Sequence, residues 1–231
     1  MATAEPPSAS SDNNARPRVF VSDNDRPVKG FSDNLRATGH LISDEKAADL
    51  VIHIERFLEP LEHAQRWLSM GVPHLLIGFS DRSIRVGPLV RHNGAPCHTC
   101  ATLTELADDS ALPVLAAQLA GTRAPSESEA GSLIAATWAS VMIRNWVAGA
   151  TDVHTSRTIF SMAHGRPTGA VRTETVDPHP ECACSAVSSR PLLPQQIAMA
   201  HVAPDPHPPP PRVAEGPARA PHRSYFYAMG I

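Results

Sequence analysis

The four cysteines of this 231-residue chain form two close pairs that lie far apart in the sequence. Cys97 and Cys100 are separated by two residues, and Cys182 and Cys184 by a single residue. Zinc takes four ligands in a tetrahedron, and each close pair can supply two thiolates from one chain segment. The sequence therefore predicts a structural zinc site with Cys97, Cys100, Cys182 and Cys184 as its ligands, joining two distant parts of one domain.

Three other uses of these cysteines stay open. Four buried free thiols would act as small apolar side chains, and a disulfide framework would need an oxidising compartment. Cys97 and Cys100 would make a redox pair of the thioredoxin-like kind, because their C-x-x-C motif follows a proline and precedes a predicted helix. That hypothesis leaves Cys182 and Cys184 without a role, and no βαβ pattern surrounds the motif. Cys97 would be a nucleophile only where no metal holds it.

The charge and the apolar patterning exclude several classes of protein. A formal net charge of -3 gives no electrostatic case for binding nucleic acid. No apolar run reaches the roughly 18 residues that a membrane-spanning helix needs. The segment from Met1 to Pro7 lacks the basic and apolar regions of a signal peptide. We therefore expect a cytoplasmic protein that binds neither nucleic acid nor membrane.

Composition divides the chain into three parts. Residues 1–17 are poor in apolar side chains and are predicted to be disordered. Residues 18–187 carry the patterns of a folded domain, and residues 188–231 form a proline-rich, stiff and extended tail. The tail ends in an aromatic cluster, Tyr225, Phe226 and Tyr227. We weigh docking of this cluster onto a partner, or onto a second copy in a homodimer, against a disordered tail with chance aromatics.

The first half of the domain has the pattern of an α/β fold. Short apolar and β-branched segments predict strands at residues 18–22, 40–42, 49–54, 73–79 and 83–90. Apolar residues at helical spacing predict helices over residues 31–37 and 60–70. Because a strand, a helix and a strand joined by short loops form a right-handed parallel crossover, we expect a truncated Rossmann-like domain whose parallel sheet is covered by helices.

The second half is predicted to be helical and then to return to the sheet. Helices are expected over residues 101–108 and 112–119. Ser126 and Glu129 form a capping-box pattern that would open a long helix ending near Val147. Its expected apolar face, which packing onto a sheet explains better than ligand binding, consists of Leu133, Ile134, Trp138, Val141, Met142 and Trp146. Residues 155–162 and 170–176 would pair as a hairpin that leads the chain to Cys182 and Cys184.

Few other residues indicate chemistry. The loop at residues 23–30 has two aspartates and a proline where a nucleotide-binding unit carries glycines, so we predict that it binds no nucleotide. Asp81, Arg82 and Arg85 follow a predicted strand, where open α/β sheets place ligands. They are candidates for binding an anion, a peptide carboxylate or a partner, and a solvated loop is the alternative. His53, His63 and His74 are expected to be ordinary core or surface residues.

Several of these stretches together resemble the ThiF/MoeB-like superfamily, which includes the ubiquitin-activating enzymes. Residues 49–54 look like a late Rossmann strand of that superfamily, and residues 74–90 look like the strand pair that leads to its zinc module. More narrowly, residues 86–90 followed by Pro96-Cys97-x-x-Cys100, with His179-Pro180-x-Cys182-x-Cys184, resemble the ThiF-like proteins of bacteriocin biosynthesis. The resemblance covers about residues 18–186.

The resemblance implies a role beside another enzyme. ThiF-like proteins of this kind bind the leader of a precursor peptide and deliver it to a YcaO-type cyclodehydratase, which makes thiazoline and oxazoline rings in the peptide. It also implies that the four cysteines bind structural zinc. This chain lacks the glycine-rich loop of adenylating members, so the expectation is a non-catalytic accessory or scaffold protein. The alternatives are a thiol-disulfide oxidoreductase that uses Cys97 and Cys100, and a degenerate ATP-dependent adenylating enzyme.

Overall fold

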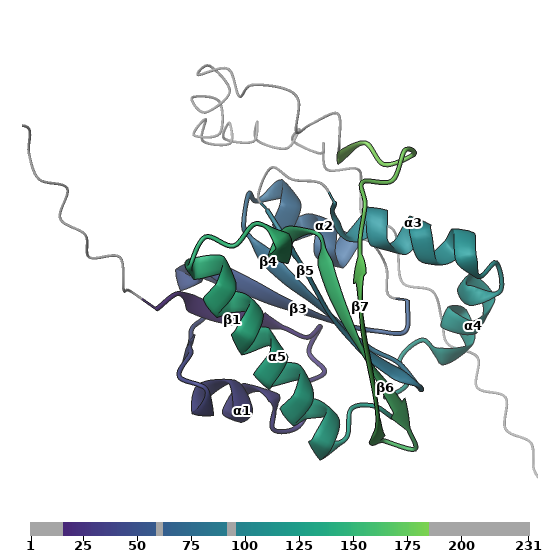
Figure 1. The fold of residues 1–231 in the computed structure, drawn as a ribbon, viewed down its shortest axis with the longest axis horizontal. Coiled ribbons are helices and arrows are strands. Elements are labelled where there is room, and N and C mark those ends of the chain that lie inside the picture. Colours follow the sequence, from purple (N-terminus) through teal and green to yellow (C-terminus); the bar gives the residue numbers. More distant parts are fainter. Residues whose placement is uncertain (1–15, 59–61, 92–95, 185–231) are drawn as a thin grey trace, which may run out of the picture. The chain divides into compact units, whose positions relative to one another are not determined.

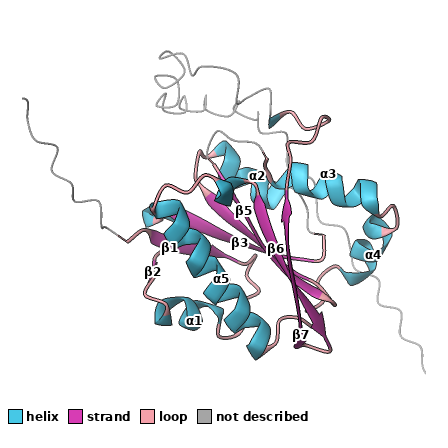
Figure 2. Cartoon of the chain, in the orientation of Figure 1, coloured by secondary structure: helices cyan, strands magenta, loops and turns pink. Residues whose placement is uncertain are grey.

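Seven strands form one mixed sheet in the computed structural model, which describes residues 16–58, 62–91 and 96–184. The strand order is β2-β1-β3-β4-β5-β6-β7 (Figures 1 and 2). The strands are β1 (Arg18–Ser22), β2 (Leu41–Ile42), β3 (Leu50–Arg56), β4 (His74–Phe79), β5 (Ser83–Val90), β6 (Ser156–Ala163) and β7 (Arg166–Thr175). The first four strands in this order are parallel, and β5, β6 and β7 continue the sheet with antiparallel pairing.

Five α-helices accompany the sheet in the described part of the chain. They are α1 (Phe31–Ala37), α2 (Glu62–Ser69), α3 (His98–Asp108), α4 (Leu112–Leu119) and α5 (Glu129–Val147). Short 3-10 turns cover Glu45–Ala47 and Asp152–His154. Among the described residues, no helix has the length and apolar character needed to cross a membrane. The predicted tail at residues 188–231, with Tyr225, Phe226 and Tyr227, and all but two residues of segment 1–17 lie outside the described residues.

The alternation of side chains along the strands separates two cores. In β4, Leu75, Ile77 and Phe79 belong to a large core that also contains residues of α1 and α5. Leu76, between them, belongs to a smaller core with Ala64 of α2 and the four cysteines. Because successive side chains of a strand point to opposite faces, α1 and α5 cover one face of the sheet, and α2 and the cysteines lie on the other.

The predicted crossover is confirmed, and the expectation of a parallel sheet holds for only part of it. β3 and β4 are parallel and are connected through α2. β4 and β5 are antiparallel, because only residues 80–82 connect them and a connection this short cannot return the chain to the start of a parallel strand. The predicted hairpin is confirmed as β6 and β7. Its turn is His164-Gly165, and both residues have left-handed φ angles, as in a type I′ turn.

The predicted start and apolar face of α5 are wrong in part. The residue that caps α5 is Ser128, whose Oγ accepts a hydrogen bond from the N–H of Gly131 at 3.1 Å, and Ser126 makes no capping bond. Leu133 is 53% exposed. The buried residues of α5 are mainly small, namely Gly131, Ser132, Ala135, Ala136, Ala139 and Ser140, with Met142 and Ile143. Small side chains let the helix lie close to the sheet. Trp138 and Trp146 are only partly buried and pack against the margin of the core.

Candidate metal centre

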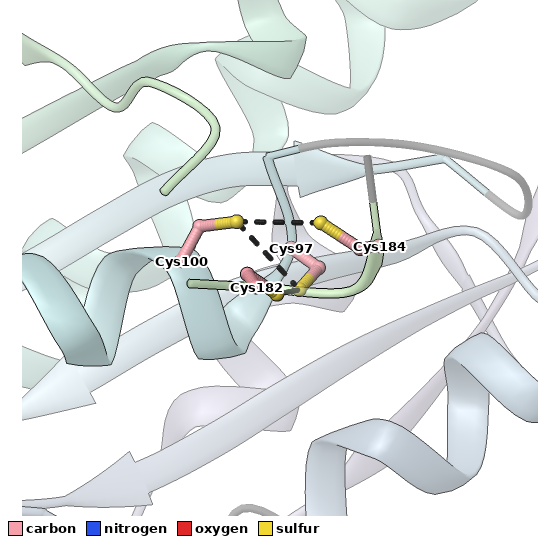
Figure 3. Close-up of side chains that lie close together, drawn as sticks. All are labelled: Cys97, Cys100, Cys182 and Cys184. Atoms are coloured by element: carbon pink, nitrogen blue, oxygen red, sulfur yellow. Dashed lines mark hydrogen bonds between the residues drawn. The ribbon is translucent and has the colours of Figure 1, made fainter. Parts of the chain in front are cut away.

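The four cysteine side chains converge at one point although the two pairs come from distant parts of the chain (Figure 3). Cys97 immediately precedes α3, and Cys100 lies in the first turn of that helix. Cys182 and Cys184 follow β7, which pairs with β6 and so returns the chain to this side of the molecule. The backbone N–H of Cys182 donates to the carbonyl of His179 at 3.0 Å, which forms a tight turn at the second pair.

The geometry of the four thiols fits a tetrahedral metal ion. The Sγ atoms of Cys97 and Cys182 are 3.6 Å apart, those of Cys100 and Cys184 are 3.3 Å apart, and those of Cys97 and Cys100 are 4.0 Å apart. All four sulfur atoms lie within 4.8 Å of one another. A zinc ion with Zn–S bonds of about 2.3 Å needs sulfur atoms about 3.8 Å apart. The four cysteines can therefore hold a metal ion with little rearrangement.

The surroundings of the thiols are apolar and closed to solvent. The four cysteines are at most 8% exposed, and Ala64, Leu76 and Val90 complete their core. Burial raises the pKa of the Cys97 thiol and of the Cys184 thiol. Burial would also raise the pKa of Cys100, but hydrogen bonds with the backbone of His179 and Cys97 outweigh it and lower this pKa. Reactive cysteines are exposed and have low pKa values, so the burial of Cys97 weighs against the redox hypothesis.

A buried charged pair lies directly beside the cysteines. His98, between Cys97 and Cys100, has its Nε2 atom 2.6 Å from Oε2 of Glu55 at the end of β3. Burial alone would raise the pKa of Glu55, but His98 and Arg85 outweigh it and lower this pKa to about 2. Burial would lower the pKa of His98, and Glu55 outweighs that effect and raises it. The pair ties the start of α3 to the sheet.

Glu105 of α3 extends this pair into a network. Its carboxylate accepts hydrogen bonds from the guanidinium groups of Arg85 on β5 and Arg157 on β6. Arg157 also donates from Nε to Oε1 of Glu174 on β7 at 2.6 Å, and Arg85 donates from Nη2 to the carbonyl of Phe57 at 3.1 Å. The network therefore joins α3, which begins directly after Cys97 and contains Cys100, to the strand that leads to Cys182 and Cys184.

Two further histidines are buried on the same face. His53 and His74 are each 1% exposed. Burial lowers the pKa of His53 to about 4, although Glu55 acts in the opposite direction. Burial also lowers the pKa of His74 to about 4, against the hydrogen bond between its Nδ1 and the carbonyl of Val72. Of the two alternatives expected for these histidines, core or surface, His53 and His74 are core residues.

These two histidines predict a loss of stability in mild acid. Histidines in the unfolded chain take up protons as the pH falls through about 6.5, whereas His53 and His74 stay neutral in the fold down to about 4. Because the unfolded state then binds more protons, the free energy of unfolding falls between these two pH values, by up to about 3 kcal/mol for each histidine. Urea unfolding at pH 7, 6 and 5 measures this dependence, and His74→Leu should reduce its slope. An unchanged slope in that variant would refute the role of His74.

The structure separates the three candidate anion-binding residues. Asp81 and Arg82 lie in the turn between β4 and β5 and line a cavity of about 830 Å³. Arg85 is only 15% exposed, does not line this cavity, and is engaged with Glu55 and Glu105. Ligand binding by Asp81 and Arg82 stays a prediction, and Arg85 is placed in the internal network.

The crevice between the ends of β1 and β3, where open α/β sheets place nucleotides, contains an arginine. Arg56 donates to the carbonyl of Asp23 at 3.2 Å and to that of Arg26, both in the loop after β1. Its Nε and Nη2 atoms also donate to the carboxylate of Glu127 at 2.9 and 3.0 Å. The side chains of Arg56 and Glu127 are only 3% and 2% exposed. The loop is thus held by a buried ion pair.

The sequence did not lead us to expect a cluster of Glu55, His98, Glu105 and Arg157. One signal was available, because Glu55 and Arg56 are two charges at the end of an otherwise apolar strand. A second was His98 itself, which lies between two candidate metal ligands. The partners Glu105 and Arg157 carry no local signal, because they lie in helical and alternating patterns where a charge normally faces solvent.

Solved structures share this fold. The heterocyclase TruD matches 72% of this chain with 27% of its own length, at 20% identity and a TM-score of 0.53. A heterocyclase in complex with substrate and cofactor matches 73% of this chain with 25% of its own, at 17% identity and a TM-score of 0.55. A chain of the E. coli microcin synthetase McbBCD complex matches 72% of this chain with 68% of its own, at 16% identity and a TM-score of 0.56. The sequence matches no family profile and no curated protein.

These similarities establish the fold. The chain corresponds to 27% and 25% of the lengths of the two heterocyclases, so it spans about a quarter of each. The shared architecture agrees with the fold that the resemblance to the ThiF/MoeB-like superfamily implies, and it does not distinguish one subtype from another. What the similar proteins do is a basis for a proposal about this chain.

Proposed function

We propose that this protein is a non-catalytic accessory protein in the biosynthesis of ribosomally made peptides that carry thiazole or oxazole rings. The observation that carries the proposal is the fold that this chain shares with two heterocyclases and with a component of a microcin synthetase complex. The pairs of cysteines, which resemble those of ThiF-like bacteriocin proteins, support it. In this role the protein engages the precursor peptide, a YcaO-type cyclodehydratase, or both.

The metal centre has a structural role in this proposal. Cys97, Cys100, Cys182 and Cys184 would hold one zinc ion, which supplies four bonds between α3 and the chain after β7 and no reaction chemistry. We place the folded domain at residues 18–187 and assign docking of a partner or a second copy to the aromatic end of the tail, Tyr225, Phe226 and Tyr227. A chain ending at residue 187 should keep its metal and lose partner binding if both assignments hold.

The absence of adenylation chemistry is part of the proposal. Asp23, Asn24 and Asp25 stand in the loop after β1, where carboxylates would repel phosphate groups, and Arg56 binds the carbonyls of that loop. We expect ATP-pyrophosphate exchange to stay at background with the purified protein, with or without a peptide. Exchange above background would favour the degenerate adenylating enzyme instead.

Co-purification tests the delivery role. The full chain, carrying an affinity tag, is expressed together with a YcaO-type cyclodehydratase and a precursor peptide from the same genomic neighbourhood. We expect the protein to retain the cyclodehydratase, the peptide, or both, and to increase the rate of ring formation that the cyclodehydratase performs. If it retains neither and does not change that rate, the delivery role is wrong.

A further inference from the structure

Strand β7 forms one edge of the sheet, and nearly all of its residues are exposed. It pairs with β6 on one side and is the last strand in the sheet order. Nine of its ten residues are exposed, and Glu174 is half-buried. The exposed residues include the apolar Val171, which is 56% exposed. Among the described residues no further strand pairs with β7. An edge strand with a row of free backbone groups is a template for pairing with another chain.

The hydrogen-bonding register identifies which backbone groups face outward. The N–H of Val176 donates to the carbonyl of Thr155, the residue directly opposite, so this is a hydrogen-bonded pair. Such pairs alternate along antiparallel strands, which places Glu174 and Arg172 in the bonds to β6. The N–H and C=O groups of Val171, Thr173 and Thr175 therefore point away from β6. Three outward residues at two-residue spacing match the repeat of an incoming strand.

β-branched residues fill these outward positions. Val171, Thr173 and Thr175 have high strand propensity, and no proline or glycine interrupts residues 170–175. Pro167 and the register irregularity opposite Phe160 and Met162, two features that protect a sheet edge, lie at the hairpin end of β7. The half of β7 at residues 171–175 is consequently the open part of the edge.

The cavity of about 830 Å³ adjoins this edge near the hairpin end of β7. Thr168, Ala170 and Arg172 of β7 line it. Arg172 alternates with the outward-bonding residues Val171 and Thr173, so its side chain lies on the opposite face from theirs. The hydroxyl-bearing residues Ser83 and Ser161 of the neighbouring strands also line it. A strand added along β7 would place every second side chain on the face of Arg172, which lines this cavity.

The charges at the cavity favour an acidic ligand. Two guanidinium groups, those of Arg82 and Arg172, line the cavity together with one carboxylate, that of Asp81. Arg172 is 67% exposed and makes one long contact, 3.7 Å, with Glu174. Glu174 itself is hydrogen-bonded to Arg157. The surplus of positive charge on this face complements carboxylates on an incoming strand.

We infer that β7 is a docking edge for an extended acidic peptide, which pairs with Val171, Thr173 and Thr175 and passes alternate side chains over the cavity at Arg82 and Arg172. The inference rests on the proposed function in taking a peptide as the ligand, and it adds the place and the mode of binding. Main-chain hydrogen bonds supply affinity in such strand addition, and the side-chain pockets supply selectivity.

Fluorescence anisotropy with a defined probe tests this inference. The probe is a labelled, end-capped nonapeptide of alternating glutamate and valine, and its counterpart has lysine in place of glutamate. Val171→Pro removes one outward N–H and leaves the bonds to β6 intact, whereas Val171→Ala keeps that N–H and is the matched control. We expect the acidic probe to bind, with about tenfold loss in Val171→Pro and for the lysine probe, and little change in Val171→Ala. Arg172→Gln should also weaken binding of the acidic probe.

Hydrogen exchange on the full-length protein completes the test. The amides of Val171, Thr173 and Thr175 should exchange rapidly without the probe and slowly with it. No binding of the probe, or equal binding by Val171→Pro and Val171→Ala, would overturn the inference. So would slow exchange without probe in a monomer, which would mean that the chain covers its own edge, or a dimer that Val171→Pro dissociates, which would mean that a second copy covers it.

Failure of the proposed function can be distinguished from failure of the docking edge. Co-purification of Val171→Pro with the YcaO-type cyclodehydratase does not depend on the edge. If the protein retains the cyclodehydratase but no peptide slows exchange of the edge amides, only the docking edge is refuted. If the acidic probe binds at the edge but the protein binds neither the cyclodehydratase nor the precursor, the docking edge is supported and the biosynthetic role is refuted.

Discussion

Cys182→Ser is expected to abolish metal binding and cooperative folding. The Sγ atom of Cys182 lies 3.6 Å from that of Cys97, and both side chains belong to a core of apolar residues and thiols. A structural zinc ion contributes about 10–16 kcal/mol at pH 7 in small zinc-binding domains, which equals or exceeds the whole stability of a typical domain. Serine provides a hydroxyl that does not replace the thiolate, so the remaining three ligands would hold the metal weakly.

Metal analysis of protein purified without chelator measures this effect. We expect about one zinc ion per chain in the natural sequence and none in Cys182→Ser or Cys97→Ser, together with the loss of a sigmoidal unfolding curve. Ala183→Ser is the matched control, because Ala183 lies between Cys182 and Cys184 and is exposed. This variant should keep its metal and its unfolding midpoint.

The opposite result has a definite meaning. A protein without metal that forms a reversible disulfide between Cys97 and Cys100 would contradict the metal centre and favour the thiol-disulfide oxidoreductase. The two outcomes differ in a second observable, since thiols that bind zinc react slowly with alkylating reagents until a chelator removes the metal. Alkylation of the full chain with and without chelator therefore separates the two hypotheses.

Local patterns were sufficient to predict the strands and the convergence of the cysteines. Each of β1, β3 and β4 is a short apolar segment bounded by turn or helix signals. Such a segment can be recognised as a strand from its own residues. The convergence of Cys97 and Cys100 with Cys182 and Cys184 could be predicted because two close pairs of cysteines are typical of a four-thiolate metal site. Both inferences depend on spacing within a few residues, which a sequence displays directly.

Features that depend on close packing were not predictable in this way. Ser126 and Ser128 both precede α5, and only the folded chain decides that Ser128 caps the helix. The buried face of α5 consists of small residues such as Ala135 and Ala139, whereas an apolar face was sought among the large ones. A close approach of helix and sheet selects small side chains, and no sequence pattern alone reveals how close that approach is.

The charged network could not be predicted from the sequence for a different reason. Arg85, Glu105 and Arg157 lie on three separate elements, β5, α3 and β6, and each looks like a residue for a solvated surface. Their burial follows from the position of α3, which the cysteines fix against this face of the sheet. The cysteine cluster and the network are thus one arrangement, of which only the cysteines are conspicuous in the sequence.

Glu105→Gln is expected to destabilise the fold strongly while leaving the metal bound. Glu105 is the one carboxylate that contacts both Arg85 and Arg157 in the described network, and those arginine side chains are 15% and 10% exposed. Removing one partner of a buried ion pair costs about 3–5 kcal/mol. Arg85 would keep Glu55 and Arg157 would keep Glu174, and both would lose the carboxylate that they share. The glutamine amide keeps the size of the side chain and loses the negative charge, so the effect reports on electrostatics.

Chemical denaturation with parallel metal analysis measures this prediction. We expect the free energy of unfolding of Glu105→Gln to fall by about 3 kcal/mol or more with the zinc content unchanged. Asp33→Asn is the control, because the pair of Asp33 with Arg36 is exposed, and such a pair contributes about 1 kcal/mol at most. Combining Glu105→Gln with Arg157→Met should recover part of the loss, since it removes one of the two cations that Glu105 neutralises. Equal and small effects of Glu105→Gln and Asp33→Asn would mean that water solvates the network, and α3 would then be held by the metal and its apolar core alone.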